Sequence, residues 1–149
     1  MRHKASEYYS IYGINKADEK GYTTLHLAAM EANDEMVKQL IESGADINAP
    51  TSHGSTPLHK ACTFGNVHTA KLLAEMGANI EAMTSNSEVL SFSNRTPLHE
   101  AAVEGKYKCV EYLISIGANI TALTEDGETP FDLAKKYNHN NIFPLFKMK

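Results

Sequence analysis

The sequence predicts an all-α solenoid, in which helix-turn-helix units stack in about four layers. One motif recurs as YTTLHLAA, STPLHKAC, RTPLHEAA and ETPFDLAK, with its fifth residues spaced 33, 40 and 33 positions apart. A second motif, SGADIN, MGANIE and IGANIT, keeps the same phase, because its glycines are 33 and 40 positions apart. Self-similarity at a period of this length indicates stacked units, each burying its apolar face against the next. Helix start and stop signals within each unit are the third observation.

The first helix of each unit is predicted to begin at a Thr-Pro pair. Proline suits the first turn of a helix, where its missing N–H costs nothing and its φ is already set. The threonine before it suits the N-cap. The pairs are Thr56 with Pro57, Thr96 with Pro97 and Thr129 with Pro130. Thr24 replaces the proline in the first unit, and a helix can start without it.

The second helix of each unit is predicted from apolar residues at i, i+3, i+4 and i+7 in EMVKQLIESG, VHTAKLLAEMG and YKCVEYLISIG. Gly44, Gly77 and Gly117 close these segments. A helix often ends in a left-handed residue there, which glycine adopts without strain. Small residues such as Ala61 and Cys62 in the first helix allow the second helix to pack closely.

The two ends of the stack must tolerate water. At the C-terminus, NNIFPLFKMK reads as the last second helix, and Pro144 about one turn in predicts that this helix is short. Its apolar residues, Ile142, Phe143, Leu145 and Phe146, are expected to cover the previous layer. At the N-terminus, residues 1–12 contain Tyr8, Tyr9 and Tyr12. Two alternatives remain open there: a segment covering the first layer, or disorder of MRHKASEYY.

The period of 33 together with T-P-L-H-x-A resembles the ankyrin repeat family. The resemblance extends from Ile14 to about the C-terminus. It implies helix pairs joined by projecting β-hairpin loops, in one ankyrin repeat domain over residues 1–149. The expected divisions are 1–17 (N-terminal cap or partial repeat), 18–50, 51–83, 84–123 (with the insertion) and 124–149 (C-terminal capping repeat).

The spacing of the repeats is interrupted once, between repeats 2 and 3. Ile80 to Thr96 spans 16 positions, where the equivalent stretch from Ile47 to Thr56 spans nine. The seven extra residues fall within 85–94, in a connection that the resemblance makes a hairpin, and loops tolerate added length at little entropic cost. The stretch carries Val89, Leu90 and Phe92. Either these side chains pack on neighbouring hairpins, or they contact another molecule and set its specificity.

Composition excludes several classes of function. The net charge is −4 and no Lys/Arg run occurs, which argues against nucleic acid as a partner. No apolar run approaches the roughly 20 residues of a membrane span, and MRHKASEYYSIYG lacks the apolar core of a signal peptide. We therefore expect no membrane partner and a cytoplasmic or nuclear protein. No nucleophile, phosphate-loop or metalloprotease motif occurs, so we expect no enzyme and no cofactor.

The recurring histidines and the two cysteines are interpreted as structural. His26, His59 and His99 lie a whole repeat apart, whereas metal ligands cluster more tightly in sequence. We expect neutral imidazoles that bond to loop backbone and to the neighbouring threonine hydroxyl, and no metal site. Cys62 and Cys109 lie in helical segments and are expected to be reduced packing residues without a disulfide.

The resemblance implies a monomeric, non-catalytic module that binds another protein through its concave face and hairpin tips, as a regulator, adaptor or targeting subunit. Acidic hairpin tips suggest a partner with basic surface. Phe64 is our first choice of anchor, since aromatic residues that a fold does not need make interface anchors. The other reading is that these are scattered exposed side chains with no partner. The predicted partner-binding residues are Tyr22, Met30, His53, Phe64, Leu90, Phe92, Arg95, Val103, Glu104, Asp126 and Tyr137.

Two alternative functions are kept. LIESGADIN resembles the Leu…Asp-Ile-Asn context in which cytosolic asparaginyl hydroxylases modify ankyrin hairpins, with Leu40 eight residues before Asn48. Asn48 would then be a modification site, although a purely structural role there is the simpler reading. The chain could also be a microbial effector that engages a host protein.

Overall fold

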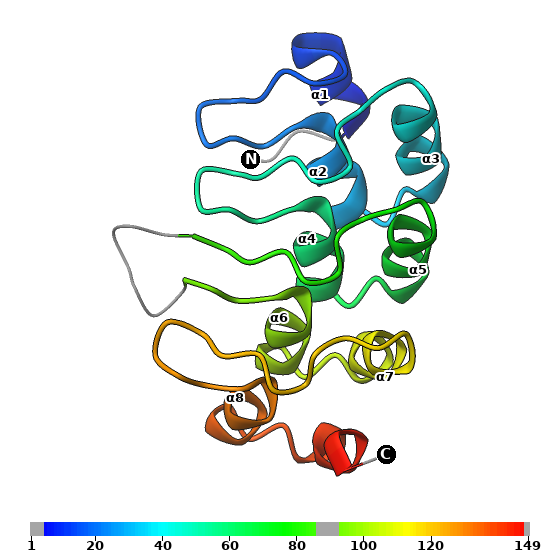
Figure 1. Ribbon diagram of the computed structural model, residues 1–149. Coiled ribbons are helices and arrows are strands. Elements are labelled where there is room, and N and C mark those ends of the chain that lie inside the picture. Colours follow the sequence, from blue (N-terminus) through cyan, green and yellow to red (C-terminus); the bar gives the residue numbers. More distant parts are fainter. Residues whose placement is uncertain (1–4, 86–92, 148–149) are drawn as a thin grey trace.

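The computed structural model describes residues 5–85 and 93–147, which form an elongated stack of helix pairs (Figure 1). The first helices form one column: α2 (Thr24–Met30), α4 (Pro57–Thr63), α6 (Pro97–Val103) and α8 (Pro130–Lys136). The second helices form the other: α3 (Asp34–Glu42), α5 (Val67–Glu75), α7 (Tyr107–Ser115) and the 3₁₀ helix η2 (Asn140–Lys147). The predicted all-α solenoid is confirmed.

The first helices start as their threonines predict. The Oγ1 atom of Thr56 accepts the N–H of His59 at 3.3 Å, and Nδ1 of His59 accepts the N–H of Thr56 at 3.1 Å. This reciprocal capping box satisfies two backbone donors that a helix start leaves without partners. Thr23, Thr96 and Thr129 cap the other three first helices in the same way.

The core lies between the two columns and depends on the small residues of the first helices. Ala61 and Cys62 of α4 have no exposed surface, and neither have Val110 and Leu113 of α7. Cys62 and Cys109 are free and fully buried, as expected of packing residues. A hydrogen bond with Cys109 and burial both raise the pKa of the Cys62 thiol, which keeps it protonated at neutral pH.

The second helices stop at their glycines. Gly44, Gly77 and Gly117 have φ values of 104°, 105° and 93°, in the region that costs residues with a Cβ free energy. After α3, the N–H of Ala45 reaches back to the carbonyl of Leu40 at 2.9 Å, which satisfies a carbonyl at the helix end. The predicted C-caps are confirmed.

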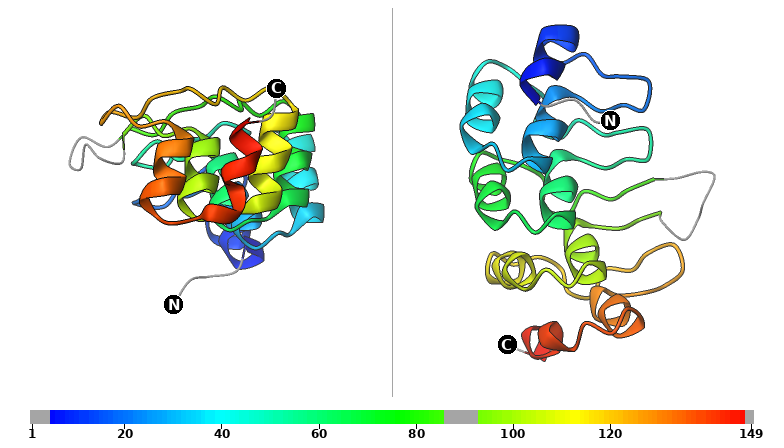
Figure 2. Two further views of the ribbon diagram at one scale, coloured as in Figure 1. Left: turned by 90° about the horizontal axis from the view of Figure 1, so that it is seen from below. Right: turned by 180° about the vertical axis from the view of Figure 1, so that it is seen from behind.

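The connections between layers project to one side as hairpins (Figures 1 and 2). In the second hairpin the N–H of Thr51 donates to Ser55 O and that of Gly54 donates to Thr51 O, both at 2.9 Å. The N–H of Ser52 donates to Lys20 O of the preceding hairpin, again at 2.9 Å. With so few bonds per arm, no regular strand forms in the described residues. The predicted loops are therefore hairpin-shaped turns without β-ladders.

The flanks of the interrupted hairpin keep the geometry of the others. Thr84 donates to Arg95 O at 2.9 Å and Asn94 donates to Thr84 O at 2.8 Å, which repeats the bonds of the second hairpin. Asn94 has a φ of 61° and takes the place of Gly54. The insertion is thereby confined to the tip between Ser85 and Ser93. Val89, Leu90 and Phe92 lie outside the described residues.

The N-terminal segment covers the first layer, which answers one question left open by the sequence. Helix α1 (Ala5–Tyr12) stacks on α2 in the first-helix column (Figure 1). The N–H of Ala5 donates to the Glu31 carboxylate at 2.8 Å, and the buried Tyr8 donates its hydroxyl to Asp18.

The C-terminal end closes with η2 instead of an α-helix. Pro144 lies inside it, where an α-helix would lose a backbone hydrogen bond and clash with the preceding turn. Ile142 and Leu145 are buried against the last layer. The rings of Phe143 and Phe146 pack on Phe131 at centroid distances of 5.3 and 5.7 Å. The predicted cover forms in a tighter helical geometry.

We predict that Gly54→Ala destabilises the protein more than Gly117→Ala. A Cβ at Gly117 meets nothing within 4 Å among the described residues, so its cost is that of the left-handed backbone, about 1 to 2 kcal/mol. A Cβ at Gly54 would lie 2.6 Å from the backbone nitrogen of Ser85 in the next hairpin. Added overpacking raises the expected loss to about 3 kcal/mol. Urea unfolding at constant m-value measures both losses, and equal losses would contradict close packing of adjacent hairpins.

Candidate interaction surface

The candidate surface runs from the hairpin tips along the first helices to the residues that cap their C-terminal ends, and we call it the recognition face (Figure 2). Of the predicted partner-binding residues, those exposed are His53, Phe64, Glu104, Asp126 and Tyr137. Tyr22 and Val103 are half-buried. Tyr22 makes an internal contact, with the Lys60 ammonium 5.0 Å from its ring centroid.

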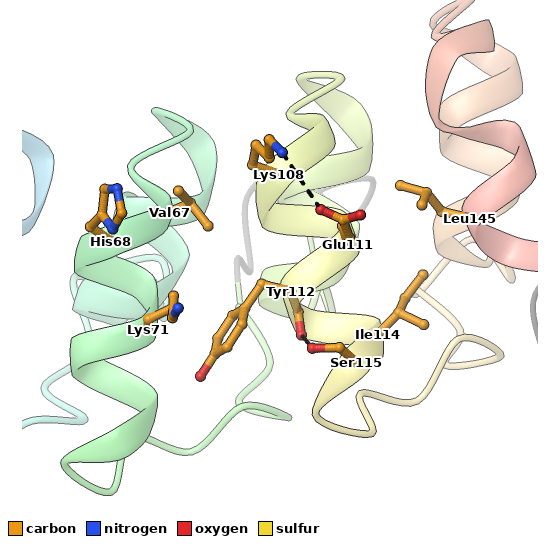
Figure 3. Close-up of a pocket in the computed structure, with 9 residues that line it drawn as sticks. All are labelled: Val67, His68, Lys71, Lys108, Glu111, Tyr112, Ile114, Ser115 and Leu145. Atoms are coloured by element: carbon orange, nitrogen blue, oxygen red, sulfur yellow. Dashed lines mark hydrogen bonds and ion pairs between the residues drawn. The ribbon is translucent and has the colours of Figure 1, made fainter.

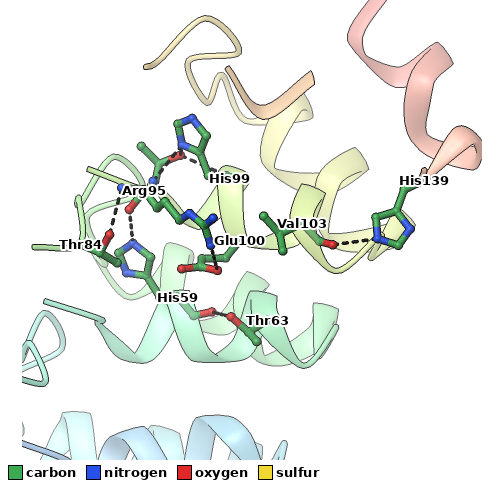
Figure 4. A network of polar contacts seen from close by, with 9 residues as sticks. His59, Thr63, Thr84, Arg95, His99, Glu100, Val103 and His139 are labelled. Atoms are coloured by element: carbon green, nitrogen blue, oxygen red, sulfur yellow. Dashed lines mark hydrogen bonds and ion pairs between the residues drawn. The ribbon is translucent and has the colours of Figure 1, made fainter. Parts of the chain in front are cut away.

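Two of the predicted contacts are buried, so the expectation that they are exposed was wrong. Met30 is only 8% exposed, because α1 and α4 pack on either side of α2 and every residue of α2 is buried between them. Arg95 is 4% exposed. Its guanidinium lies 3.8 Å from the carboxylate of Glu100 on α6 (Figure 4). Sequence position could not reveal this pairing, which turns the arginine back onto its own layer.

Two carboxylates of the first-helix side, Glu100 and Glu128, are paired with cations. Burial raises the pKa of Glu100, and the Arg95 guanidinium opposes that rise. In the fourth layer, the ammonium of Lys136 lies 3.4 Å from the carboxylate of Glu128. Both of these carboxylates have a cationic partner within their own layer.

The repeated geometry of the face depends on three imidazoles that each join one layer to the next hairpin. The Nε2 atom of His59 donates to the carbonyl of Arg95 at 2.8 Å (Figure 4). His26 makes the same bond to Ser55 O at 2.9 Å, and His99 to Glu128 O at 3.0 Å. Because Nδ1 accepts a backbone N–H, these rings are neutral and donate from Nε2. The structural role predicted for the histidines is confirmed.

A second set of contacts aligns the C-terminal ends of the first helices. The Nδ2 atom of Asn66 donates to Ala29 O at 2.9 Å in the layer before. The Nε2 atom of His139 lies 2.7 Å from Val103 O, also in the layer before (Figure 4). Lys106 takes the equivalent place in the third layer, and its methylene carbons pack on Gly65. The C-terminal ends of α2, α4 and α6 are therefore each contacted by a side chain from the following layer.

Asn48 has a structural role and is also accessible. Its backbone N–H donates to Asp46 Oδ1 at 3.0 Å, and its own Oδ1 accepts the N–H of Asn79 in the next layer at 2.9 Å. The residue is exposed. Its modification by a hydroxylase remains a prediction.

Sequence reasoning missed a groove on the opposite side of the stack, between α5 and α7 (Figure 3). Its volume is about 820 Å³. Tyr112 points into the space between the two helices, and the Lys71 ammonium lies 5.8 Å from its ring centroid. The apolar periodicity of YKCVEYLISIG predicts a second helix, but it does not indicate how far apart neighbouring second helices lie. The lining residues are Val67, His68, Lys71, Lys108, Glu111, Tyr112, Ile114, Ser115 and Leu145.

The family model described as ankyrin repeats (3 copies) matches residues 5–84 and 82–147. A comparison with curated proteins gives no match. Across residues 5–85 and 93–147, no helix has the length and apolar character that a membrane crossing needs. In the same ranges, no three His, Cys, Asp or Glu side chains gather as a metal site would require.

We predict that stability falls as the pH drops from about 6.5 towards 4. Burial lowers the pKa of His26 and of His59 from 6.5 to about 4. Between these values the unfolded chain binds protons that the folded chain refuses, so acid favours unfolding. Each imidazole should lower the free energy of unfolding by about 2 kcal/mol at about pH 5 relative to about pH 7.5.

Urea unfolding at the two pH values measures this loss. His59→Gln should remove the share of one imidazole from the pH-dependent difference. His68→Gln, at an exposed position, is the control and should leave the difference unchanged. A wild-type stability that is constant between the two pH values would show that these rings are not buried as neutral groups.

Proposed function

Because this chain belongs to the ankyrin repeat family, whose repeats are generally protein-protein interaction modules, we propose that it binds a partner protein through its recognition face. It would act without chemistry of its own, as a regulator, adaptor or targeting subunit in the cytoplasm or nucleus. The observation that carries this proposal is Phe64, an aromatic side chain that the fold exposes and does not use.

Phe64 is the C-cap residue of α4 and is 46% exposed. The equivalent residues of α2 and α6 are Glu31 and Glu104, so the position does not require an apolar side chain for folding. No ring contact engages Phe64 within the part of the chain that the structure describes. An exposed aromatic ring on a rigid element offers a large contact area at a low entropic cost.

The charge of the hairpin tips supports a partner with basic surface. Glu19, Glu125 and Asp126 are exposed at the tips. Asp18 belongs to the fold instead, because its carboxylate accepts the N–H groups of Lys20 and Tyr22. Exposed carboxylates of one sign steer a cationic partner and make its association dependent on salt.

We predict that Phe64→Ala leaves the free energy of unfolding within about 0.5 kcal/mol of wild type and weakens partner binding by about 2 kcal/mol or more. Affinity capture would identify the partner, and calorimetry would compare the variants. Tyr107→Ala is the matched control, since Tyr107 is a similarly exposed aromatic residue at the start of α7. Loss of fold in Phe64→Ala would make Phe64 a core residue, and equal binding by both variants would place the interface elsewhere.

We predict that deletion of residues 86–92 leaves a folded stack and changes the set of captured partners. Joining Ser85 to Ser93 restores the spacing of the second hairpin, in which Ser52 and His53 occupy the equivalent positions. The hydrogen bonds that close the interrupted hairpin, between Thr84, Asn94 and Arg95, do not involve the deleted residues. Circular dichroism and capture from lysate test the two parts. Unchanged capture would assign the insertion no role in specificity.

The hydroxylase alternative rests on the LIESGADIN pattern, and the exposure of Asn48 is compatible with it. Incubation with an asparaginyl hydroxylase, oxygen and 2-oxoglutarate, followed by intact-mass measurement, tests it directly. An added oxygen atom that is absent in Asn48→Ala would support modification at this site. An unchanged mass would leave Asn48 with its structural hydrogen bonds to Asp46 and Asn79 as its role. The effector alternative predicts a captured partner from a host rather than from the organism that makes the chain.

A further inference from the structure

The residues that cap the first helices form a row along the recognition face, which we call the cap ladder: Glu31, Phe64, Glu104 and Tyr137. Their backbones are nearly identical, with φ of −85°, −89°, −91° and −101°. The same backbone at the same place in stacked layers sends the four side chains out along one edge. Exposed aromatic residues, Phe64 and Tyr137, thus lie one layer to either side of a carboxylate, Glu104.

Glu104 differs from the neighbouring carboxylates. Glu31 accepts the N–H of Ala5, Glu100 pairs with Arg95, and Glu128 pairs with Lys136. Glu104 is exposed, and across residues 5–85 and 93–147 no hydrogen bond or ion pair engages its carboxylate. Lys106, two residues further on, turns its methylene carbons onto Gly65 of the preceding layer.

The two aromatic residues of the cap ladder are also accessible to a ligand. Phe64 is 46% and Tyr137 42% exposed, and neither ring contacts another ring or a cation in the described ranges. A carboxylate between two exposed aromatic faces suits a guanidinium, which pairs with the carboxylate and stacks well on rings. Large apolar side chains suit the rings themselves.

The spacing of the layers limits the shape of the ligand. Packed helices lie about 8 to 10 Å apart, so the three sites follow one another at about that interval. A polyproline II segment advances about 9.3 Å in three residues and returns to the same face after three. Its side chains at i, i+3 and i+6 therefore match three successive layers.

We propose that the cap ladder binds an extended segment of a partner protein that carries an arginine with a large apolar side chain three residues before it and another three residues after it. The arginine contacts Glu104, and the apolar side chains contact Phe64 and Tyr137. This inference rests on the proposed function and adds the chemistry of the partner.

Selection from a displayed library of random linear peptides tests the proposal. Wild type should enrich peptides with a central arginine flanked by apolar residues at the third position on each side. Glu104→Arg, a change at an exposed site, should enrich an acidic residue at the central position instead. Enrichment of peptides without a cation, or the same peptides on both proteins, would overturn the inference.

An enriched peptide, synthesised with a fluorophore, then measures each contact by anisotropy. Phe64→Ala and Tyr137→Ala should each weaken its binding about tenfold or more, and Glu104→Gln about three- to tenfold. Tyr107→Ala should leave it unchanged. Equal affinity across all four variants would place the peptide elsewhere and overturn the assignment.

The experiment separates this inference from the proposed function. If no linear peptide is enriched, the proposal that the ligand is an extended segment is wrong. Capture of a folded partner that still depends on Phe64 would in that case preserve the proposed function. If neither peptides nor proteins bind in a Phe64-dependent way, both proposals fail.

Discussion

The stack depends on one repeated contact, the bond from a first-helix imidazole to a carbonyl of the next hairpin. Nδ1 of His59 caps its own helix, while Nε2 reaches Arg95 O in the following layer. One ring therefore fixes both a helix start and the orientation of the next hairpin, which it can do only when neutral. The fourth layer supports this account. Asp132 makes the capping contact there, and no hairpin follows α8 in the described residues for a second bond to hold.

The same contact explains why the insertion leaves the stack intact. His59 binds the backbone carbonyl of Arg95 at the base of the hairpin, and the N–H of Ser85 donates to His53 O of the preceding hairpin, so both contacts lie outside the insertion. Thr84 and Asn94 close the hairpin below the insertion, with Asn94 in the left-handed conformation that glycine has in the other tips. The entropic cost of closing a loop rises slowly with its length, so a longer connection beyond these bonds is compatible with the stack.

Local chemistry made much of this predictable from the sequence. Threonine caps, terminal glycines and the histidine bonds follow from single residues and their near neighbours, and all are confirmed. The exposure of individual side chains could not be predicted in this way, because it depends on which residues other layers place against them. Met30 is covered because α1 and α4 enclose α2, and Arg95 because Glu100 lies within reach. The groove beside Tyr112 likewise depends on the separation of α5 and α7, which no periodicity encodes.

The positions that stabilise the fold and those proposed to bind a partner differ in how many kinds of side chain they tolerate. A residue at the histidine position must cap, stay neutral and reach the next hairpin, so few side chains serve. A C-cap needs only a right-handed backbone that most residues adopt, and here it carries Glu31, Phe64, Glu104 and Tyr137 in turn. Variation at such positions costs the fold little. Specificity can therefore change along the cap ladder while the imidazole contacts keep every layer in register.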